Sequence, residues 1–124
     1  MTKTIEFARE NGFIETLLGR RRYPRDINSR NTAIRHTAEH NAINMPIQGA
    51  AADMIKIAMI NLHRELAGSA RMLLQVHDEL ILEVTREEVE TVGAIVRRCM
   101  CEALPMDVPI VVDIGTGSNW LDAH

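Results

Sequence analysis

The spacing of apolar positions changes along the chain, and each spacing predicts a different element. Helical periods predict helices over residues 2–10 and 31–43, the first stopped by Asn11-Gly12 and the second capped by Asn31. Between them, "FIETLLGRRRY" predicts a short hairpin that turns at Gly19, and "PRDINSR" predicts a turn-rich link. The first third of the chain therefore predicts helix, hairpin and helix.

The pattern in the middle of the chain predicts a third, longer helix. Asn44-Met45-Pro46 predicts a break before it, because proline lacks a backbone donor. A helical period then runs over residues 48–66 and ends at Gly68. Its apolar positions are Ala51, Ile55, Ala58, Leu62 and Leu66. Asp53, an acid in this helix, is expected to form a structural pair with another group.

The last third predicts a hairpin, a helix and a final strand. Apolar runs over residues 71–76 and 80–84 predict two strands joined by a turn at 77–79. Thr85 with Glu88 predicts a capping box that opens a helix to about Leu104. "PIVVDI" predicts a last strand, and "GTGSNW" a turn. The expected buried stripe of the helix is Val89, Val92, Val96, Cys99 and Ala103. This order of elements predicts an α+β fold, with an antiparallel sheet and helices packed on one face.

Composition narrows the class of protein. A length of 124 residues with 46% hydrophobic and 25% charged residues is typical of one globular domain, or part of a larger one. The apolar stretches are too short to span a bilayer, and we expect no signal peptide. Cys99 and Cys101 lie two apart on a predicted helix, where neighbouring side chains diverge, so no disulfide is expected. The expected location is cytoplasmic, with no membrane partner.

The net charge of −3 conceals a strong asymmetry. Residues 1–71 carry 11 Lys and Arg against 7 Asp and Glu, whereas residues 72–124 carry 3 against 10. Six of the arginines lie between Arg20 and Arg35. Such a division indicates a surface that faces a polyanion and a separate acidic surface or metal site, although solvated charged faces explain the same counts.

Three ionisable residues, His77, Asp78 and Glu79, interrupt the apolar runs of the second hairpin. Unpaired charges are costly to bury, so a tight, exposed turn is their natural place. Carboxylates held on rigid strands suit two-metal phosphoryl transfer, in which the ions lie about 3.5–4 Å apart. A simple solvated turn explains the same residues, because turns are rich in Asp.

The surrounding sequence resembles the family A DNA polymerases, the bacterial DNA polymerase I family. "RMLLQVHDELILEV" is similar to the carboxy-terminal palm motif of that family. "GFIETLLGRRRYPRDINSRN", "AEHNAINMPIQGAAADMIKIAMI" and "DVPIVVDIGTGSNWLDAH" resemble other segments of it, in the same order. The resemblance covers about residues 4–124 and implies an antiparallel palm sheet within a partial polymerase domain.

The resemblance also implies roles for individual residues. Asp78 matches the palm aspartate that binds the catalytic Mg²⁺ ions, and Glu79 matches its catalytic acidic neighbour. His77 matches a residue near the primer terminus, and Asn44 and Gln48 match residues that contact the duplex. Further DNA contacts are expected from Arg20, Arg21, Arg22 and His40. His40 stands where the family usually has Arg, so a titratable charge replaces a permanent one.

The resemblance leaves parts of the family unmatched. Nothing in the chain matches the family's other metal-binding motif, D-Y-S-x-I-E-L-R, or the fingers helix that holds the incoming nucleotide. We therefore expect residues 1–45 to form the fingers-to-palm return segment and residues 46–124 the carboxy-terminal part of the palm. The implied partners are primer-template DNA, a deoxynucleoside triphosphate and the rest of the polymerase chain. The isolated chain is expected to be inactive and to self-associate through uncovered sheet edges.

Two other classes of function remain open on the residues alone. One is a non-catalytic module that binds DNA or packs on another subunit. The other is a small metal-dependent phosphohydrolase that uses His77 and Asp78. The second is less favoured, because His36, His40 and His63 lack metal-site spacing on one helical face.

Overall fold

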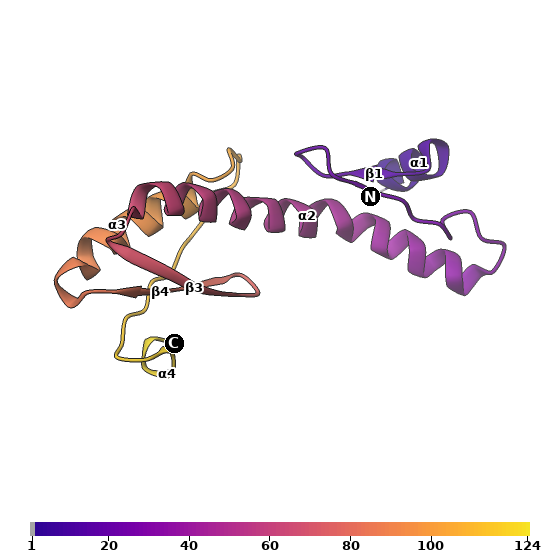
Figure 1. Ribbon diagram of the computed structural model, residues 1–124. Helices are drawn as coiled ribbons and strands as arrows, with labels where there is room; N and C mark the ends of the chain where they lie inside the picture. The colour runs from indigo at the N-terminus through magenta and orange to yellow at the C-terminus, as the bar shows by residue number, and fades with distance from the viewer. Residues whose placement is uncertain (1) are drawn as a thin grey trace. The chain divides into compact units, whose positions relative to one another are not determined.

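The computed structural model describes residues 2–124, which form helices and two small antiparallel sheets (Figure 1). The chain divides into two compact units, one ending at Asp53 and the other beginning at Met54. This boundary falls within a helix, as does the domain boundary expected after residue 45, which stays a prediction. The α+β fold class is confirmed.

The first unit begins with helix α1 (Thr2–Asn11) and a short hairpin, β1 (Ile14–Glu15) and β2 (Arg21–Arg22). Gly12 ends α1 with a φ of 78°, a left-handed conformation that suits glycine, and its amide donates to Ala8 O at 2.9 Å. The strands pair with Ile14 opposite Arg22. The predicted helix stop and hairpin are both confirmed.

The core of the first unit is small and consists mainly of aliphatic side chains. Its members are Ala8, Ile14, Ile27, Ala38, Ala42 and Met45. They come from α1, β1, the link that follows β2, and the first half of helix α2 (Thr32–Leu66). Asn31 caps α2, because its Oδ1 accepts from Ala33 N at 3.0 Å. The predicted cap is confirmed.

Helix α2 continues without interruption through Pro46, so the predicted break at Asn44-Met45-Pro46 is wrong. Proline removes one backbone hydrogen bond from a helix interior and costs about 3 kcal/mol there. Buried side chains on both sides of it, Ala42, Met45 and Ala50, hold the helical course of this segment by their packing. Packing between elements has outweighed the unfavourable effect of proline on the helix.

The second unit contains the end of α2, a hairpin and a further helix (Figure 1). Strands β3 (Ala70–Val76) and β4 (Glu79–Val84) are antiparallel, with Val76 opposite Glu79 and a bulge between Met72 and Leu74. The turn between the strands is therefore His77-Asp78, one residue shorter than predicted, and Glu79 belongs to β4. The two strands are confirmed.

Helix α3 (Val89–Cys101) follows a single turn of 3₁₀ helix, η1 (Arg86–Glu88). The predicted capping box is wrong, because Thr85 Oγ1 donates to the Glu88 carboxylate at 3.2 Å and caps no backbone amide. The helix also ends three residues before Leu104. Its stripe is confirmed at Val92, Val96 and Cys99, which are buried, whereas Val89 is half-buried. Ala103 is buried as predicted but lies beyond the end of the helix.

Helices α2 and α3 cover one face of the β3–β4 hairpin. Leu62, Leu66, Val92, Val96 and Cys99 form the buried core. Leu80, Leu82 and Val84, which alternate along β4, pack against it, so their neighbours Glu79, Ile81 and Glu83 point to the other face. Glu65 and Arg98 form an ion pair between α2 and α3. Helices on one face of an antiparallel sheet were predicted.

The predicted last strand, "PIVVDI", is wrong: residues 109–114 form no strand. Two of its carbonyl oxygens accept hydrogen bonds from side chains of α3 instead of from a neighbouring strand. Arg97 donates to Val112 O at 3.0 Å, and Cys101 Sγ to Ile110 O at 3.4 Å. The chain then turns into a short helix, α4 (Trp120–Ala123), capped by Asn119.

Gly49, on α2, allows a close approach between this helix and Thr16 of the hairpin. A Cβ built on it would lie 2.3 Å from Thr16 Cγ2, so Gly49→Ala is expected to lower the free energy of unfolding by about 1–3 kcal/mol through overpacking. Thermal melting of the chain measures the change. Thr16→Ser, which removes that methyl group and keeps the hydroxyl, should restore most of the loss in the double variant.

Gly93 on α3 provides the matched control. A Cβ there would meet nothing within 4 Å, so Gly93→Ala should stabilise the chain by up to about 1 kcal/mol through helix propensity alone. Equal melting temperatures for Gly49→Ala and the unmodified chain would contradict the close approach.

Candidate metal and DNA-binding site

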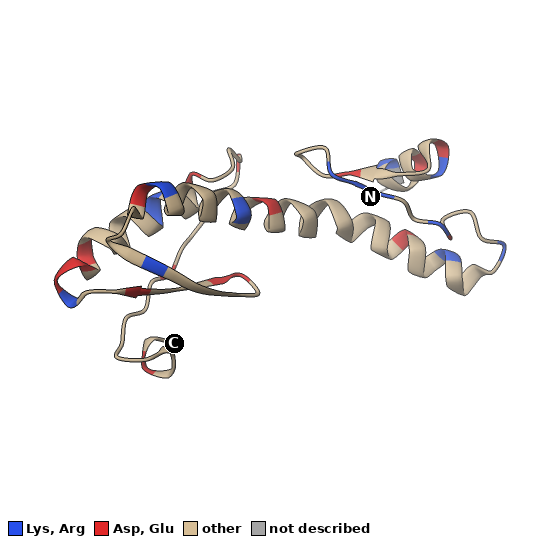
Figure 2. Cartoon of the chain, in the orientation of Figure 1, with Lys and Arg blue, Asp and Glu red and all other residues tan. Residues whose placement is uncertain are grey.

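Asp78 lies at the tip of the β3–β4 hairpin, in a two-residue turn. His77 and Asp78 are both exposed, and Glu79, the first residue of β4, is half-buried. His77 has a φ of 55°, a left-handed conformation that a tight hairpin turn demands and that glycine adopts most easily. The short turn therefore fixes the Asp78 backbone on two paired strands. In Figure 2 the red of acidic residues marks the chain near this turn.

Glu79 has a partner that the sequence did not indicate. His124 Nδ1 lies 3.5 Å from Glu79 Oε1, so the last residues of the chain fold back to the hairpin. Gly115 and Gly117 allow this return, because a Cβ on either would lie 2.6 Å or less from the backbone of α4. No local pattern links residues 79 and 124, which explains why the contact was missed.

The turn offers the type of ligand that a hard cation prefers, carboxylate oxygens, but too few of them to hold the ion alone. Asp78 and Glu79 bring two carboxylates, and Mg²⁺ in proteins is commonly bound through one or two carboxylates together with substrate phosphates and water. Among residues 2–124, no group of three or more His, Cys, Asp or Glu side chains could hold a metal ion. Asp78 is the residue that would hold Mg²⁺.

The first unit carries the residues expected to contact DNA, apart from His77 in the second unit. His40, Asn44 and Gln48 follow one another at intervals of four residues on α2, so they form a polar line along one side of it. His40 and Gln48 are exposed and Asn44 is half-buried. Asn44 Nδ2 lies 3.4 Å from His40 Nδ1, so these two side chains are in contact.

The three consecutive arginines have different surroundings. The Arg20 guanidinium donates to Asp53, which confirms the expected structural pair of that carboxylate. Arg21 donates to Glu15, and its guanidinium carbon lies 4.3 Å from the centroid of the Phe13 ring. The hydrogen bond to Glu15 raises the pKa of Arg21 above its ordinary value. In the part of the chain that the structure describes, Arg22 has no acidic partner.

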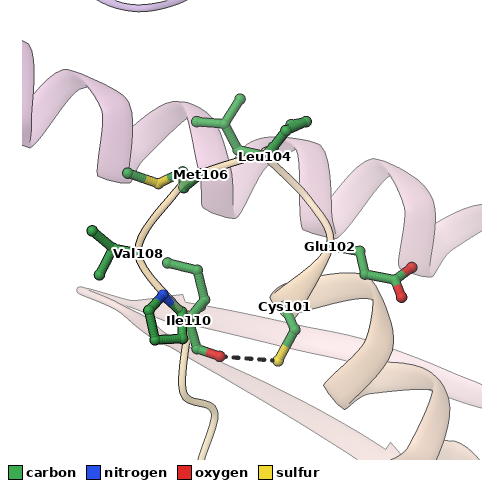
Figure 3. Close-up of a pocket in the computed structure, with 8 residues that line it drawn as sticks. Cys101, Glu102, Leu104, Met106, Val108 and Ile110 are labelled. Atoms are coloured by element: carbon green, nitrogen blue, oxygen red, sulfur yellow. Dashed lines mark hydrogen bonds between the residues drawn. The ribbon is translucent and has the colours of Figure 1, made fainter.

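Two hollows are lined by residues other than those of the hairpin tip. One, in the first unit, has a volume of about 310 Å³ and is lined by residues that include Arg22, Arg25, Thr37 and Asn41. The other, of about 350 Å³, lies between the end of α3 and the segment that follows it (Figure 3). Cys101 lines the second hollow, and its thiol is occupied with Ile110 O.

The cysteines give no sign of covalent chemistry. Both are free thiols, and Cys99 is buried in the core of the second unit. Burial raises the pKa of the Cys99 thiol, and the nearby Glu65 carboxylate raises it further. A raised pKa keeps this thiol protonated at neutral pH, where it serves as a small core side chain.

None of the helices between residues 2 and 124 combines the length and apolar character needed to cross a membrane. Long α2 carries charged residues along its course, including Asp53 and Lys56.

Comparison with known proteins gives one consistent family. The family model described as DNA polymerase family A matches residues 1–122. DNA polymerase I of Pseudomonas aeruginosa is 50% identical over 127 residues, and the thermostable DNA polymerase I of Thermus thermophilus is 49% identical over 122. These alignments cover 100% and 98% of this chain, but only 14% and 15% of the relatives.

A solved structure agrees with the family. It is the POL domain of Pol1 from M. smegmatis, in complex with DNA primer-template and dNTP. It is 44% identical to this chain with a TM-score of 0.92, and the match covers 98% of this chain and 22% of that one. The chain thus spans about 15% of the length of the curated relatives it matches. On the match over residues 1–122 and identities near one half, the chain belongs to DNA polymerase family A.

Proposed function

We propose that the chain supplies the carboxy-terminal palm segment of a DNA-directed DNA polymerase that acts in DNA replication and repair. The reaction is attack of a primer 3′-hydroxyl on the α-phosphate of a deoxynucleoside triphosphate, with pyrophosphate leaving. The observation that carries the proposal is the carboxylate pair Asp78 and Glu79 at the tip of a rigid hairpin, in a chain of this family.

Asp78 and Glu79 have distinct parts in this proposal. The exposed Asp78 carboxylate binds Mg²⁺, which when bound stabilises the charge that develops on the reacting oxygens. Glu79 adds a second negative charge beside it, and its contact with His124 restrains the direction in which its carboxylate points. His77, exposed in the same turn, faces the primer terminus.

The polar line on α2 reads the duplex without selecting a sequence. Side-chain amides such as those of Asn44 and Gln48 donate to the acceptors that every base pair offers in the minor groove. A polymerase needs contacts of this kind, because it must accept any correctly paired primer end. His40, in contact with Asn44, extends the line by one helical turn.

The partners follow from the same assignment. They are primer-template DNA, an incoming nucleotide and the remaining polymerase polypeptide. Exposed apolar side chains support the last of these, because Leu73 and Leu74 on β3 and Val111 beyond α3 are 50%, 54% and 82% exposed. A cytoplasmic location, in keeping with two free cysteines, is part of the proposal, and self-association of the isolated chain stays a prediction.

Primer extension tests the proposed function. A chimaera in which this chain replaces the matching segment of Pseudomonas aeruginosa DNA polymerase I should extend a primer in the presence of Mg²⁺ and all four nucleotides. The isolated chain should not, because the family's residues that hold the nucleotide have no match in it. An inactive chimaera that folds and binds duplex, or templated extension by the chain alone, would contradict the assignment.

A non-catalytic DNA-binding module is the second candidate, favoured by Arg22, for which the described residues supply no acidic partner. It predicts duplex binding by the chimaera without extension, so the same assay separates the two.

A further inference from the structure

Asp53 is a buried acid on α2 whose two oxygens are both engaged by the β1–β2 hairpin. Its side chain is 4% exposed, a position in which an unpaired carboxylate would be costly. Oδ2 accepts from Thr16 Oγ1 at 3.2 Å, and Oδ1 accepts from the Arg20 guanidinium. One side chain of α2 therefore holds the residues at both ends of the hairpin turn.

Thr16 passes this restraint to the hairpin backbone. Besides donating to Asp53, its hydroxyl oxygen accepts from Arg20 N at 3.2 Å. The backbone of the turn is closed by Thr16 N to Arg20 O at 2.9 Å and by Gly19 N to Thr16 O at 3.0 Å. Residues 16–20 are thus held together by their own hydrogen bonds, and both ends of the turn bind the Asp53 carboxylate of α2.

Gly49, one helical turn before Asp53, brings the hairpin onto the helix itself. The absence of a Cβ there lets the Thr16 methyl group lie against the α2 backbone. Gly49 directly follows Gln48, which is exposed. The hairpin therefore rests on the turn of α2 that carries a proposed duplex contact.

We propose that Asp53 is a positioning residue that, through Thr16 and Arg20, fixes the arginine-bearing hairpin against the turn of α2 that carries Gln48. In this arrangement Arg20 neutralises Asp53 and makes no phosphate contact. Arg21 is paired with Glu15, so Arg22 is the member of the three that neutralises a DNA phosphate. The inference rests on the proposed function, and it assigns to the three arginines three separate tasks.

Salt dependence of duplex binding separates these tasks in the chimaera with Pseudomonas aeruginosa DNA polymerase I. Each neutralised phosphate adds about 0.9 to the slope of log affinity against log salt. Arg22→Ala should therefore reduce the slope by about 0.9. Arg20→Ala should reduce it by less, because the Arg22 side chain is still present on a hairpin that is less firmly held. Lys3→Ala, which removes an exposed charge on α1, is the control for a general loss of positive charge.

Kinetics test the positioning role. Because these variants loosen a contact with the duplex and leave the reacting groups in place, Arg20→Ala and Asp53→Asn should each raise the KM for primer-template by about 10-fold to 100-fold, with kcat within about twofold. The double variant Arg20→Ala/Asp53→Asn should have a KM no higher than that of either single variant, because both substitutions remove the same restraint. Thr16→Ser, which keeps the hydroxyl, should retain the KM of the unmodified chimaera, and Thr16→Val should not.

Several outcomes would overturn the inference. One is a salt slope that falls as much in Arg20→Ala as in Arg22→Ala. Another is an unchanged KM in both Arg20→Ala and Asp53→Asn at a temperature well below their melting points, where a structural role alone leaves kinetics intact. If Asp53→Asn does not fold, Arg20→Ala carries the test, since that side chain is 51% exposed. Failure of the proposed function is separate: it shows as an unmodified chimaera without extension, while the salt slopes stay measurable.

Discussion

Asp78→Asn in the chimaera is expected to lower kcat for primer extension by at least about a thousandfold, with little change in folding or duplex affinity. The amide keeps the size of the side chain and removes the charge that binds Mg²⁺. Metal stabilisation of the transition state contributes several kcal/mol, and each 1.36 kcal/mol corresponds to a factor of ten in rate. Single-turnover extension measures the rate, and thermal melting the stability.

A matched control lies on the same hairpin. Glu83 in β4 is also an exposed carboxylate, and Glu83→Gln removes the same charge several residues from the turn. It should change the rate by less than about twofold, because exposed positions away from special features tolerate such changes within about 0.5 kcal/mol. Asp78→Asn that melts as early as a core truncation, or that keeps its rate, would assign Asp78 a structural role instead.

Leu62→Ala is expected to produce the largest loss of stability. Leu62 is 0% exposed and lies in the core where α2 meets α3 and the β3–β4 hairpin. Truncation of a buried leucine costs about 2–5 kcal/mol, partly through the transfer of apolar surface and partly through the cavity that remains. Denaturant unfolding of the chain should show this loss as a lower midpoint with an unchanged slope.

Ile60, two residues earlier on α2, is the control. It is 52% exposed, so Ile60→Ala should cost no more than about 0.5 kcal/mol although it removes a side chain of the same size. Equal losses for the two variants would mean that the second unit does not pack as described.

The elements that sequence reasoning predicted correctly are those with short-range causes. Asn31 caps α2 through its own side chain, and Gly12 and Gly19 adopt φ angles of 78° and 79° where turns were expected. The β3–β4 hairpin follows from two apolar runs separated by polar residues. Each of these depends on neighbours within a few positions, which a single sequence contains.

The incorrect predictions at Pro46 and at residues 109–114 concern interactions between distant residues, whereas the one at Thr85 is local. Pro46 lies inside a helix whose nearby residues Ala42 and Met45 belong to a core shared with α1, β1 and the link after β2. Residues 109–114 have the composition of a strand, yet α3 side chains take up two of their carbonyl groups. Thr85 had the correct spacing for a capping box and paired with a side chain instead.

The same difference between local and long-range interactions decides which residues of the candidate site could be predicted. The residues of the hairpin tip could be predicted, because they lie together in one contiguous sequence motif, "RMLLQVHDELILEV". The partners of Asp53 lie 33 and 37 residues away, and His124 lies far along the chain from Glu79. An acid within the buried side of a helix signals that a partner exists, but its identity depends on the fold.

The two-residue turn at His77-Asp78 has a consequence for how this segment can change in length. Insertion of one residue would shift β4 by one position and reverse its two faces. Leu80, Leu82 and Val84 would then leave the core, and Glu79 and Glu83 would enter it. The placement of the Asp78 carboxylate and the packing of the second unit thus depend on the same pairing register, so insertions and deletions at this turn would be lost through misfolding before any effect on catalysis could be selected.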